Sequence, residues 1–126
     1  MLGAHQKKTP LDLLSLLRML NRKLVLEKMV ATADPHTAIV SYLGRASRDL
    51  YSITEDIRNR CFYFLGAMGS VVPFALGLSL AKPKVSIWAI EGDGSILMNM
   101  GALTTLKKYR QSNLKLFIID NQQYES

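Results

Sequence analysis

Apolar and polar positions divide the chain into short runs that suit strands and longer stretches with helical spacing. Residues 38–43, 85–90 and 116–119 are largely apolar runs, each followed by a glycine or a polar residue, and this pattern predicts buried strands. Residues 70–81 and 96–109 carry apolar side chains at helical spacing, which predicts helices. Strand-like and helix-like segments therefore alternate along the chain.

Other helices are predicted from their start signals. Thr9 is an N-cap candidate followed by Pro10 and Asp12, and the leucines after them form a broad apolar face. Residues 47–57 form a more polar segment that is interpreted as a helix with loop character. Ser95 is the natural N-cap of the helix over residues 96–109.

The last two predicted strands and the helix between them form a βαβ unit, so both strands are expected to be parallel. Asp93 and Asn121 follow these strands and should project at the same sheet edge, where open α/β sheets bind ligands. Their carboxylate and amide oxygens suit Mg²⁺, and a helix opening at Ser95 offers amide groups to a diphosphate. Gly92 and Gly94 permit a tight turn. Such a Gly-Asp-Gly run alone is more often an ordinary turn. The presence of Asn121 after the next predicted strand favours a binding site instead.

Composition limits the class of protein. The 126 residues, 48% of them hydrophobic, can fill the core of one domain, and no linker marks a second. The single cysteine, Cys61, excludes an internal disulfide, so a reducing, cytoplasmic setting is the simplest expectation. Asp12, Arg18 and Arg22 interrupt the leucine-rich N-terminal segment, and neither a transmembrane helix nor a secretory signal is expected.

The net charge of +6 raises nucleic-acid binding as a competing hypothesis. The basic residues are scattered in small groups, such as Lys7-Lys8, Arg22-Lys23 and Lys107-Lys108, and no recognition motif accompanies them. A solvated surface, or attraction for an anionic substrate and cofactor, explains them more simply. No nucleic-acid partner is therefore expected.

Two motifs carry a resemblance to a known family. Gly92-Asp93-Gly94-Ser95, with Asn121 after the next strand, resembles the cofactor motif of thiamine-diphosphate-dependent enzymes. Gly66-Ala67-Met68-Gly69 is similar to the family's turn that holds the aminopyrimidine ring, and the two motifs stand in the family's order. From about residue 39 to the end, the sequence most resembles the decarboxylases of sulfopyruvate and phosphonopyruvate. The resemblance implies the thiamine-diphosphate-binding fold, a doubly wound parallel α/β sheet with helices on both faces.

The resemblance also implies a metal and diphosphate site. Asp93 and the Asn121 side chain would bind Mg²⁺, with the Gln123 backbone carbonyl as a third ligand. Gly94 and Ser95 would hold the diphosphate of thiamine diphosphate. The diphosphate end of the cofactor is therefore expected at the carboxyl ends of the last two predicted strands.

The other end of the cofactor is expected at the earlier motif. The Gly66 carbonyl would accept a hydrogen bond from the aminopyrimidine amino group, and Met68 would lie between the two rings. Taken singly, Met68 is more often core packing and Ser47 more often a helix cap than a ligand. The full set of expected cofactor-binding residues is Gly44, Ser47, Gly66, Ala67, Met68, Gly92, Asp93, Gly94, Ser95, Asn121 and Gln123.

The resemblance places no catalytic residue in this chain. The family's activating glutamate comes from a pyrimidine-binding domain, and the sequence context is wrong for that role at Glu27, Glu55, Glu91 and Glu125. Activity is therefore expected only with a pyrimidine-binding, alpha-type partner subunit, in a hetero-oligomer or a homo-oligomer. The expected reaction is decarboxylation of a 2-oxo acid that carries a sulfonate or phosphonate group, with release of an aldehyde.

Relatives in this family are expected to continue beyond Ser126 with a glycine-rich loop, further strands and a closing helix. Residues 1–126 are accordingly expected to form a single thiamine-diphosphate-binding domain that is incomplete at its C-terminal end. Its open sheet edge would invite pairing with another chain. The alternative is a non-catalytic interaction or regulatory homologue, although retention of Asp93, Asn121 and Met68 favours a site that still binds.

Overall fold

The computed structural model of the chain describes residues 22–120. In this range one sheet has the strand order β2-β1-β3-β4, and every neighbouring pair is parallel. The strands are β1 (Ala38–Ser41), β2 (Cys61–Tyr63), β3 (Ile87–Gly92) and β4 (Leu114–Ile119). The parallel α/β prediction is confirmed. The helix predicted to begin near Thr9, and the predicted ligands Asn121 and Gln123, lie outside the described residues.

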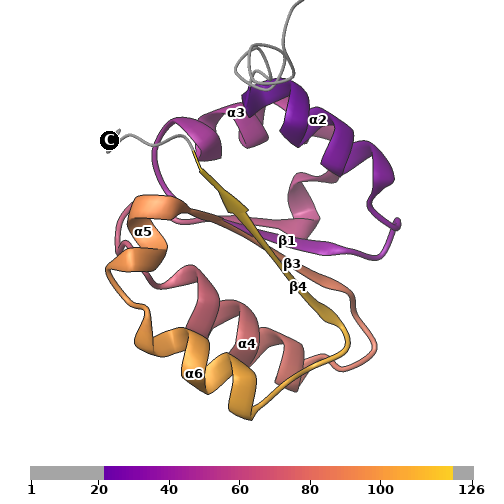
Figure 1. Cartoon of the computed structure of the whole chain (residues 1–126). Coiled ribbons are helices and arrows are strands. Elements are labelled where there is room, and N and C mark those ends of the chain that lie inside the picture. Colours follow the sequence, from indigo (N-terminus) through magenta and orange to yellow (C-terminus); the bar gives the residue numbers. More distant parts are fainter. Residues whose placement is uncertain (1–21, 121–126) are drawn as a thin grey trace, which may run out of the picture.

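Helices cover both faces of the sheet (Figure 1). The helices α2 (Arg22–Thr32) and α3 (Arg45–Ile53) lie on one face, and α4 (Val71–Ala81) and α6 (Gly101–Lys108) lie on the other. All six residues of β3 are buried, because alternate side chains of a strand enter opposite layers. Trp88 and Ile90 join the core beneath α2 and α3, whereas Ile87 and Ala89 join the core beneath α4.

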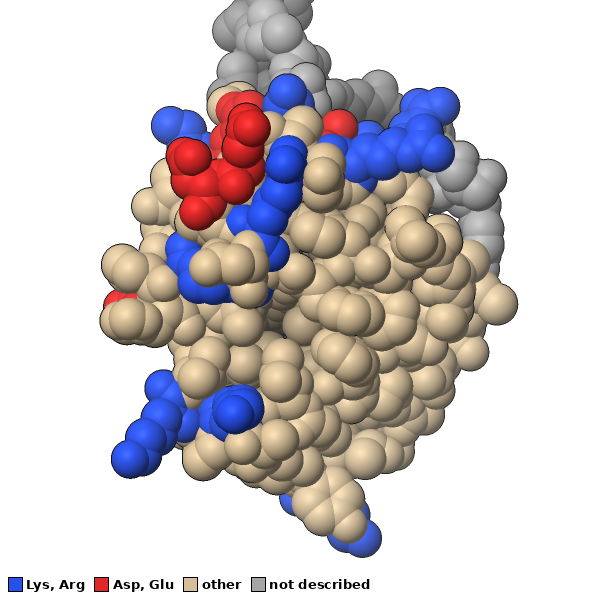
Figure 2. Space-filling view, turned by 180° about the vertical axis from the view of Figure 1, so that it is seen from behind, with Lys and Arg blue, Asp and Glu red and all other residues tan. Residues whose placement is uncertain are grey.

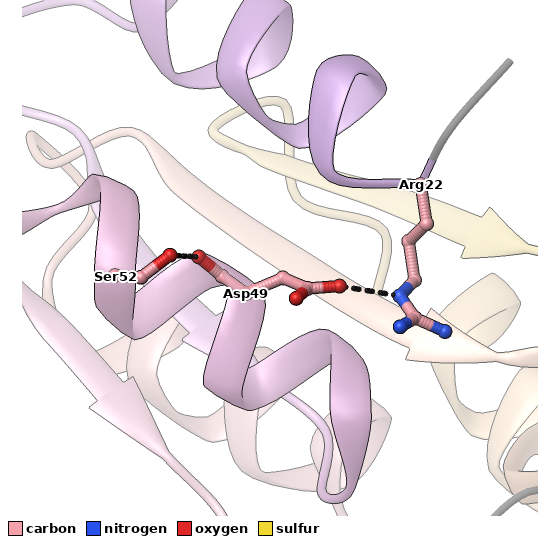
Figure 3. Close-up of polar contacts among 3 residues, drawn as sticks. All are labelled: Arg22, Asp49 and Ser52. Atoms are coloured by element: carbon pink, nitrogen blue, oxygen red, sulfur yellow. Dashed lines mark hydrogen bonds and ion pairs between the residues drawn. The ribbon is translucent and has the colours of Figure 1, made fainter.

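An ion pair joins the two helices of the first layer (Figure 3). Arg22 Nε of α2 donates a hydrogen bond to Asp49 Oδ2 of α3 at 2.8 Å, and Ser52 Oγ donates to the Asp49 backbone carbonyl at 2.7 Å. The region predicted as one helix over residues 47–57 is in fact α3 followed by a 3₁₀ helix, η1 (Glu55–Arg60). The Thr54 hydroxyl lies at the junction and donates to the Leu50 carbonyl at 2.7 Å.

The strands extend differently from their predicted bounds. β1 ends at Ser41, earlier than predicted, and β4 begins at Leu114, earlier than predicted. β3 continues past the predicted end at residue 90, because its ladder with β4 runs on to the pair Gly92↔Ile119. The polar Glu91 is therefore a fully buried strand residue.

The single helix predicted over residues 96–109 is wrong. The structure has α5 (Asp93–Leu97) and then α6, separated by a tight turn in which Asn99 N donates to the Ile96 carbonyl at 3.1 Å. The Asn99 side chain is held elsewhere, since its Nδ2 donates to the Gly69 carbonyl at 2.9 Å. Gly101 follows the turn, and glycine is a poor helix former. The prediction that Ser95 is the N-cap is also wrong, because Gly92 occupies the N-cap and Ser95 lies inside α5.

Candidate functional site

The order of the strands creates a switch point between β1 and β3. From β1 the chain passes through α3 to β2 on one side, and from β2 it passes through α4 to β3 on the other side of β1. Ligands of doubly wound sheets bind in the crevice at the carboxyl ends of the strands where the order reverses. Gly44 follows β1 and Asp93 follows β3, so the two flank this switch point. Figure 1 shows that α5 lies at the same end of the sheet as the carboxyl end of β4.

Asp93 is the first residue of α5 and is partly exposed. The residue before it, Gly92, is buried and has no room for a side chain, because a Cβ there would lie 2.7 Å from Tyr42 Cε2. The φ of Gly92 is −91°, a value that any residue adopts, so the glycine is required for the close approach of the Tyr42 ring. The ring therefore supports the backbone that carries Asp93.

Hydrogen bonds join the two predicted cofactor motifs. The Gly69 amide donates to Ser95 Oγ at 2.9 Å, and Asn99 Nδ2 donates to the Gly69 carbonyl at 2.9 Å. Gly69 has φ of 80°, and a Cβ on it would lie 2.6 Å from the Asn99 Cβ. The turn after β2 and the helix after β3 are thus fixed to each other. Asn99 was not predicted to contribute to the site, because its only signal in the sequence is a lone amide between Met98 and Met100.

The turn at residues 66–69 is exposed at Gly66 and Ala67 and buried at Gly69. Gly66 is exposed and a Cβ on it would meet no atom within 4 Å. Ala67 has φ of 61° and is the one non-glycine residue of the described range in this left-handed region, which costs free energy and is typical of functional turns. Met68 is half-buried, so it is neither enclosed in the core nor fully exposed to solvent.

The segment after β1 differs in detail from its prediction. Gly44, with φ of 83°, is the N-cap residue of α3, a conformation that favours glycine. Ser47 lies within the helix and is buried at 7% exposure. The interpretation of Ser47 as a cap is therefore wrong, and its side chain is enclosed rather than presented at the sheet edge.

Glu91 is a buried carboxyl group next to the site. Its side chain has 0% exposure, Oε1 accepts a hydrogen bond from the Gly92 amide at 3.2 Å, and Oε2 has no partner among the described residues. Burial raises the pKa of Glu91, while the nearby polar groups of Ser95, Gly92 and Val71 oppose that rise. Burial likewise raises the pKa of Tyr42, with Asp93 and Glu91 adding to the rise and Arg22 opposing it. The sequence signal for Glu91 is a carboxylate inside an apolar strand.

The donor groups fit a metal ion that is shared with phosphate oxygens. In the part of the chain that the structure describes, no three His, Cys, Asp or Glu side chains gather to enclose a metal. A single carboxylate such as Asp93 at the sheet edge suits Mg²⁺, which is usually bound by one or two carboxylates together with substrate phosphates. The α5 helix has only five residues, so its macrodipole contributes little, and its amide groups are what it can offer to a diphosphate.

On the face drawn in Figure 2, the basic side chains do not gather into one block. Figure 2 shows Lys and Arg at the top, the lower left and the bottom of one face, with uncharged surface between them. This distribution gives no support to a nucleic-acid groove on that face, which would need a continuous basic track. Across residues 22–120, no helix is both long enough and apolar enough to cross a membrane.

Comparison with known proteins gives a family and several relatives. The family described as "Thiamine pyrophosphate enzyme, C-terminal TPP binding domain" matches residues 43–126. Phosphonopyruvate decarboxylase from Streptomyces hygroscopicus is 39% identical over 105 residues, which are 83% of this chain and 25% of that protein. Sulfopyruvate decarboxylase subunit beta from Methanocaldococcus jannaschii is 42% identical over 103 residues, 81% of this chain and 53% of that subunit. The corresponding subunit from Methanothermobacter thermautotrophicus is 38% identical over 106 residues, 84% of this chain and 55% of that subunit.

The chain spans between a quarter and about half of the length of these relatives. The family match includes the turn at residues 66–69, the Asp93 turn and the strands β2, β3 and β4 that carry them. The fold, the two motifs and this match agree, and the chain belongs to the thiamine pyrophosphate enzymes, within their C-terminal TPP-binding domain.

Proposed function

We propose that this chain is the diphosphate-binding and Mg²⁺-binding half of a thiamine-diphosphate-dependent 2-oxo acid decarboxylase. The observation that carries the proposal is a pair of hydrogen bonds at Gly69, whose amide donates to Ser95 Oγ and whose carbonyl accepts from Asn99 Nδ2, because this pair joins the two motifs at one sheet edge. A cofactor with a diphosphate at one end and a ring system at the other needs both motifs at a fixed separation. Residues 1–126 then act as one thiamine-diphosphate-binding domain.

In this proposal Asp93 supplies the carboxylate ligand to Mg²⁺, with the Asn121 side chain and the Gln123 carbonyl completing the protein ligands. Gly94 and Ser95 hold the diphosphate through their backbone amides. The Ser95 hydroxyl is not available for that role, because it is buried at 3% exposure and accepts the Gly69 amide. When bound, the cofactor supplies a thiazolium that accepts the electrons left as CO₂ departs from the 2-oxo acid.

The turn after β2 holds the other end of the cofactor. The Gly66 carbonyl accepts a hydrogen bond from the aminopyrimidine amino group, and the half-buried Met68 separates the two rings. The open space around Gly66 and the left-handed conformation of Ala67 support this assignment. Gly44 and Ser47 lie on the β1 side of the switch point; Gly44 borders the diphosphate, and Ser47 contributes by supporting the backbone.

The relatives support a proposal for the substrate and the partner. Sulfopyruvate or phosphonopyruvate is proposed as the substrate, because the relatives that match over most of this chain are named for them. A pyrimidine-binding subunit is proposed as the partner that supplies the activating glutamate, since two relatives of this chain are named as beta subunits. A cytoplasmic setting belongs to the same proposal and accords with the free thiol of Cys61.

A second candidate function is a non-catalytic interaction or regulatory homologue. It is favoured by apolar side chains at both edges of the described sheet, where Phe62 of β2 is 47% exposed and Ile118 of β4 is 49% exposed. Such edges are suited to contact with another chain. A catalytic subunit with a partner would use the same surfaces, so activity has to separate the two candidates.

A CO₂-release assay tests the proposed function. The chain is assayed with thiamine diphosphate and Mg²⁺, alone and co-expressed with a pyrimidine-binding subunit, on sulfopyruvate and phosphonopyruvate, with pyruvate as the control substrate. We expect turnover of one of the two anionic substrates by the pair and none by the chain alone. No CO₂ release by a stably assembled pair would contradict the proposal and favour the regulatory homologue.

A further inference from the structure

The helix α4 carries no charged residue on any of its faces. Its one polar side chain, Ser79, is fully buried. A helix that is apolar all round is usually enclosed by other parts of a protein. The exposed residues of α4 are nevertheless all apolar, namely Pro73, Phe74, Gly77, Leu80 and Ala81. This outer face is therefore suited to contact with another protein.

A groove of about 460 Å³ lies between α4 and α6, which run side by side on one face of the sheet (Figure 1). Gly77 of α4 and Gly101 of α6 line it, and a Cβ on either glycine would meet no atom within 4 Å. Leu80 and Tyr109 line the groove near the C-terminal ends of the two helices. The small residues leave room for a further helix to pack between α4 and α6.

The C-terminal ends of α4 and α6 form a basic rim at one end of the groove. Both helices connect parallel strands of the same sheet and lie on the same face, so their C-terminal ends coincide. Five exposed basic residues close or follow these helices, namely Lys82, Lys84, Lys107, Lys108 and Arg110. The helix macrodipole accounts for cations in a last turn, whereas Lys84 and Arg110 lie beyond the helices.

No exposed carboxylate balances this rim within the same layer. Between residues 64 and 114 the acidic residues are Glu91, which is buried, and Asp93, which lies at the carboxyl end of β3, away from the rim. The lower part of the face in Figure 2 shows basic and no acidic side chains, and α4 and α6 lie in the lower part of Figure 1. The groove therefore fits an apolar partner segment that carries negative charge at one end.

The other end of the groove adjoins the candidate site. Asn99 lines the groove and also donates from Nδ2 to the Gly69 carbonyl at 2.9 Å. The methionines on either side of Asn99 are exposed, and flexible methionine side chains suit adaptable contact surfaces. Phe74 of α4 stacks on Phe62 of β2, with 4.7 Å between the ring centroids. The exposed apolar surface thus extends from the groove to the strand that precedes the turn at residues 66–69.

We propose that this groove receives an amphipathic helix of the pyrimidine-binding partner, which lays an apolar stripe over Gly77 and Gly101 and places carboxylates beside the basic rim. The inference rests on the proposed function, which requires such a partner at the neighbouring turn. A helix fits because the groove lies between two helices and exposes no strand edge. A second copy of this chain that used the same face would bring no carboxylate to the rim.

Calorimetric titration of the full chain with a separately purified pyrimidine-binding subunit, at low and at high salt, tests the docking surface. Gly77→Leu and Gly101→Leu each fill the groove, and both positions have open space around an added Cβ. Ala31→Leu is the matched control, because Ala31 is exposed on α2, on the other face of the sheet. Urea unfolding checks the variants, and Gly77→Leu should be at least as stable as the unaltered chain, since leucine is the better helix former.

We expect both groove variants to bind the partner roughly tenfold more weakly or worse, as for a blocked central contact, and Ala31→Leu to bind as the unaltered chain does. Lys107→Glu with Lys108→Glu should weaken binding at low salt and much less at high salt, whereas Lys28→Glu, on α2, should not. Unchanged affinity in both groove variants overturns the proposal. So does a salt dependence that the rim variant leaves unchanged, or no binding by the unaltered chain.

Two further measurements separate this inference from its rivals. In sedimentation equilibrium of the chain alone, a dimer that is lost in Gly77→Leu would assign the groove to a second copy and overturn the proposal. CO₂ release by the assembled pair tests the proposed function separately. A pair that assembles through the groove without releasing CO₂ contradicts the proposed function and leaves the docking surface standing, whereas an active pair that assembles normally with Gly77→Leu and Gly101→Leu does the reverse.

Discussion

Replacing Gly69 with alanine places a methyl group where the structure has no room for one. Gly69 has φ of 80°, and its added Cβ would lie 2.6 Å from the Asn99 Cβ and 3.3 Å from the Ser95 carbonyl oxygen. The left-handed backbone costs alanine about 1–2 kcal/mol, and overpacking of this kind costs about 1–3 kcal/mol. The free energy of unfolding should therefore fall by about 2–5 kcal/mol, a large part of the stability of an ordinary domain.

Urea unfolding of the full chain, followed by circular dichroism, measures this loss. With a slope of about 2 kcal/mol per molar urea, the midpoint should fall by roughly 1–2.5 M. Gly77→Ala is the matched control, because Gly77 lies in α4 with nothing within 4 Å of an added Cβ. That control should stabilise the chain by about 0.5–1 kcal/mol, since alanine is the better helix former.

A double variant separates the two causes. Asn99→Gly removes the clashing Cβ but leaves the left-handed backbone of residue 69 unchanged, so it should recover only the steric part. The loss in the double variant should be smaller than the sum of the two single losses by about 1 kcal/mol or more. A Gly69→Ala variant within about 0.5 kcal/mol of the unaltered chain would refute the reasoning, because it would show that the turn and α5 are not in close contact.

Three further outcomes are expected. Burial raises the pKa of Glu91 above the ordinary 4.5, so its contribution to stability is fully present below that pH and is lost as the pH rises through the folded-state pKa. The stability of Glu91→Gln relative to the unaltered chain should therefore increase from about pH 4.5 upward. A difference in the free energy of unfolding by urea that does not change with pH would contradict this. Burial raises the pKa of Tyr63 to about 12, so stability should be lost between about pH 10 and 12 and Tyr63→Phe should reduce that loss, measured by unfolding at each pH. Asp49→Asn should cost less than about 1 kcal/mol, because the Asp49 and Arg22 side chains are 27% and 22% exposed; a larger loss in thermal unfolding would show that their ion pair matters more than its exposure indicates.

Much of the fold follows from local pattern, and its exceptions have tertiary causes. The strand core of β3 was predictable because both of its faces are buried, which gives a continuous apolar run. The break between α5 and α6 was not, because it depends on the Asn99 side chain reaching Gly69, thirty residues away in the sequence. The same contact explains why a pattern with helical spacing does not form one helix.

The candidate site was predictable in its motifs but not in its connections. The position of Asp93 after β3 followed from the end of the apolar run, whereas the enclosed hydroxyl of Ser95 depends on how the turn after β2 packs against α5. The sequence context of Glu91 does not suit the activating glutamate, and the sequence alone does not predict its full burial next to the Asp93 turn. The roles assigned to the site residues stay predictions.

The central claim is that Asp93 binds the metal through which the cofactor diphosphate is held. Calorimetric titration of thiamine diphosphate into the chain assembled with a pyrimidine-binding subunit, with Mg²⁺ and with a chelator, tests it most directly. Asp93→Ala is compared with Asp56→Ala, a change at an exposed carboxylate of η1. We expect Mg²⁺-dependent binding that survives Asp56→Ala and is lost in Asp93→Ala. Equal affinity with and without Asp93, or binding that does not depend on the metal, would contradict the claim.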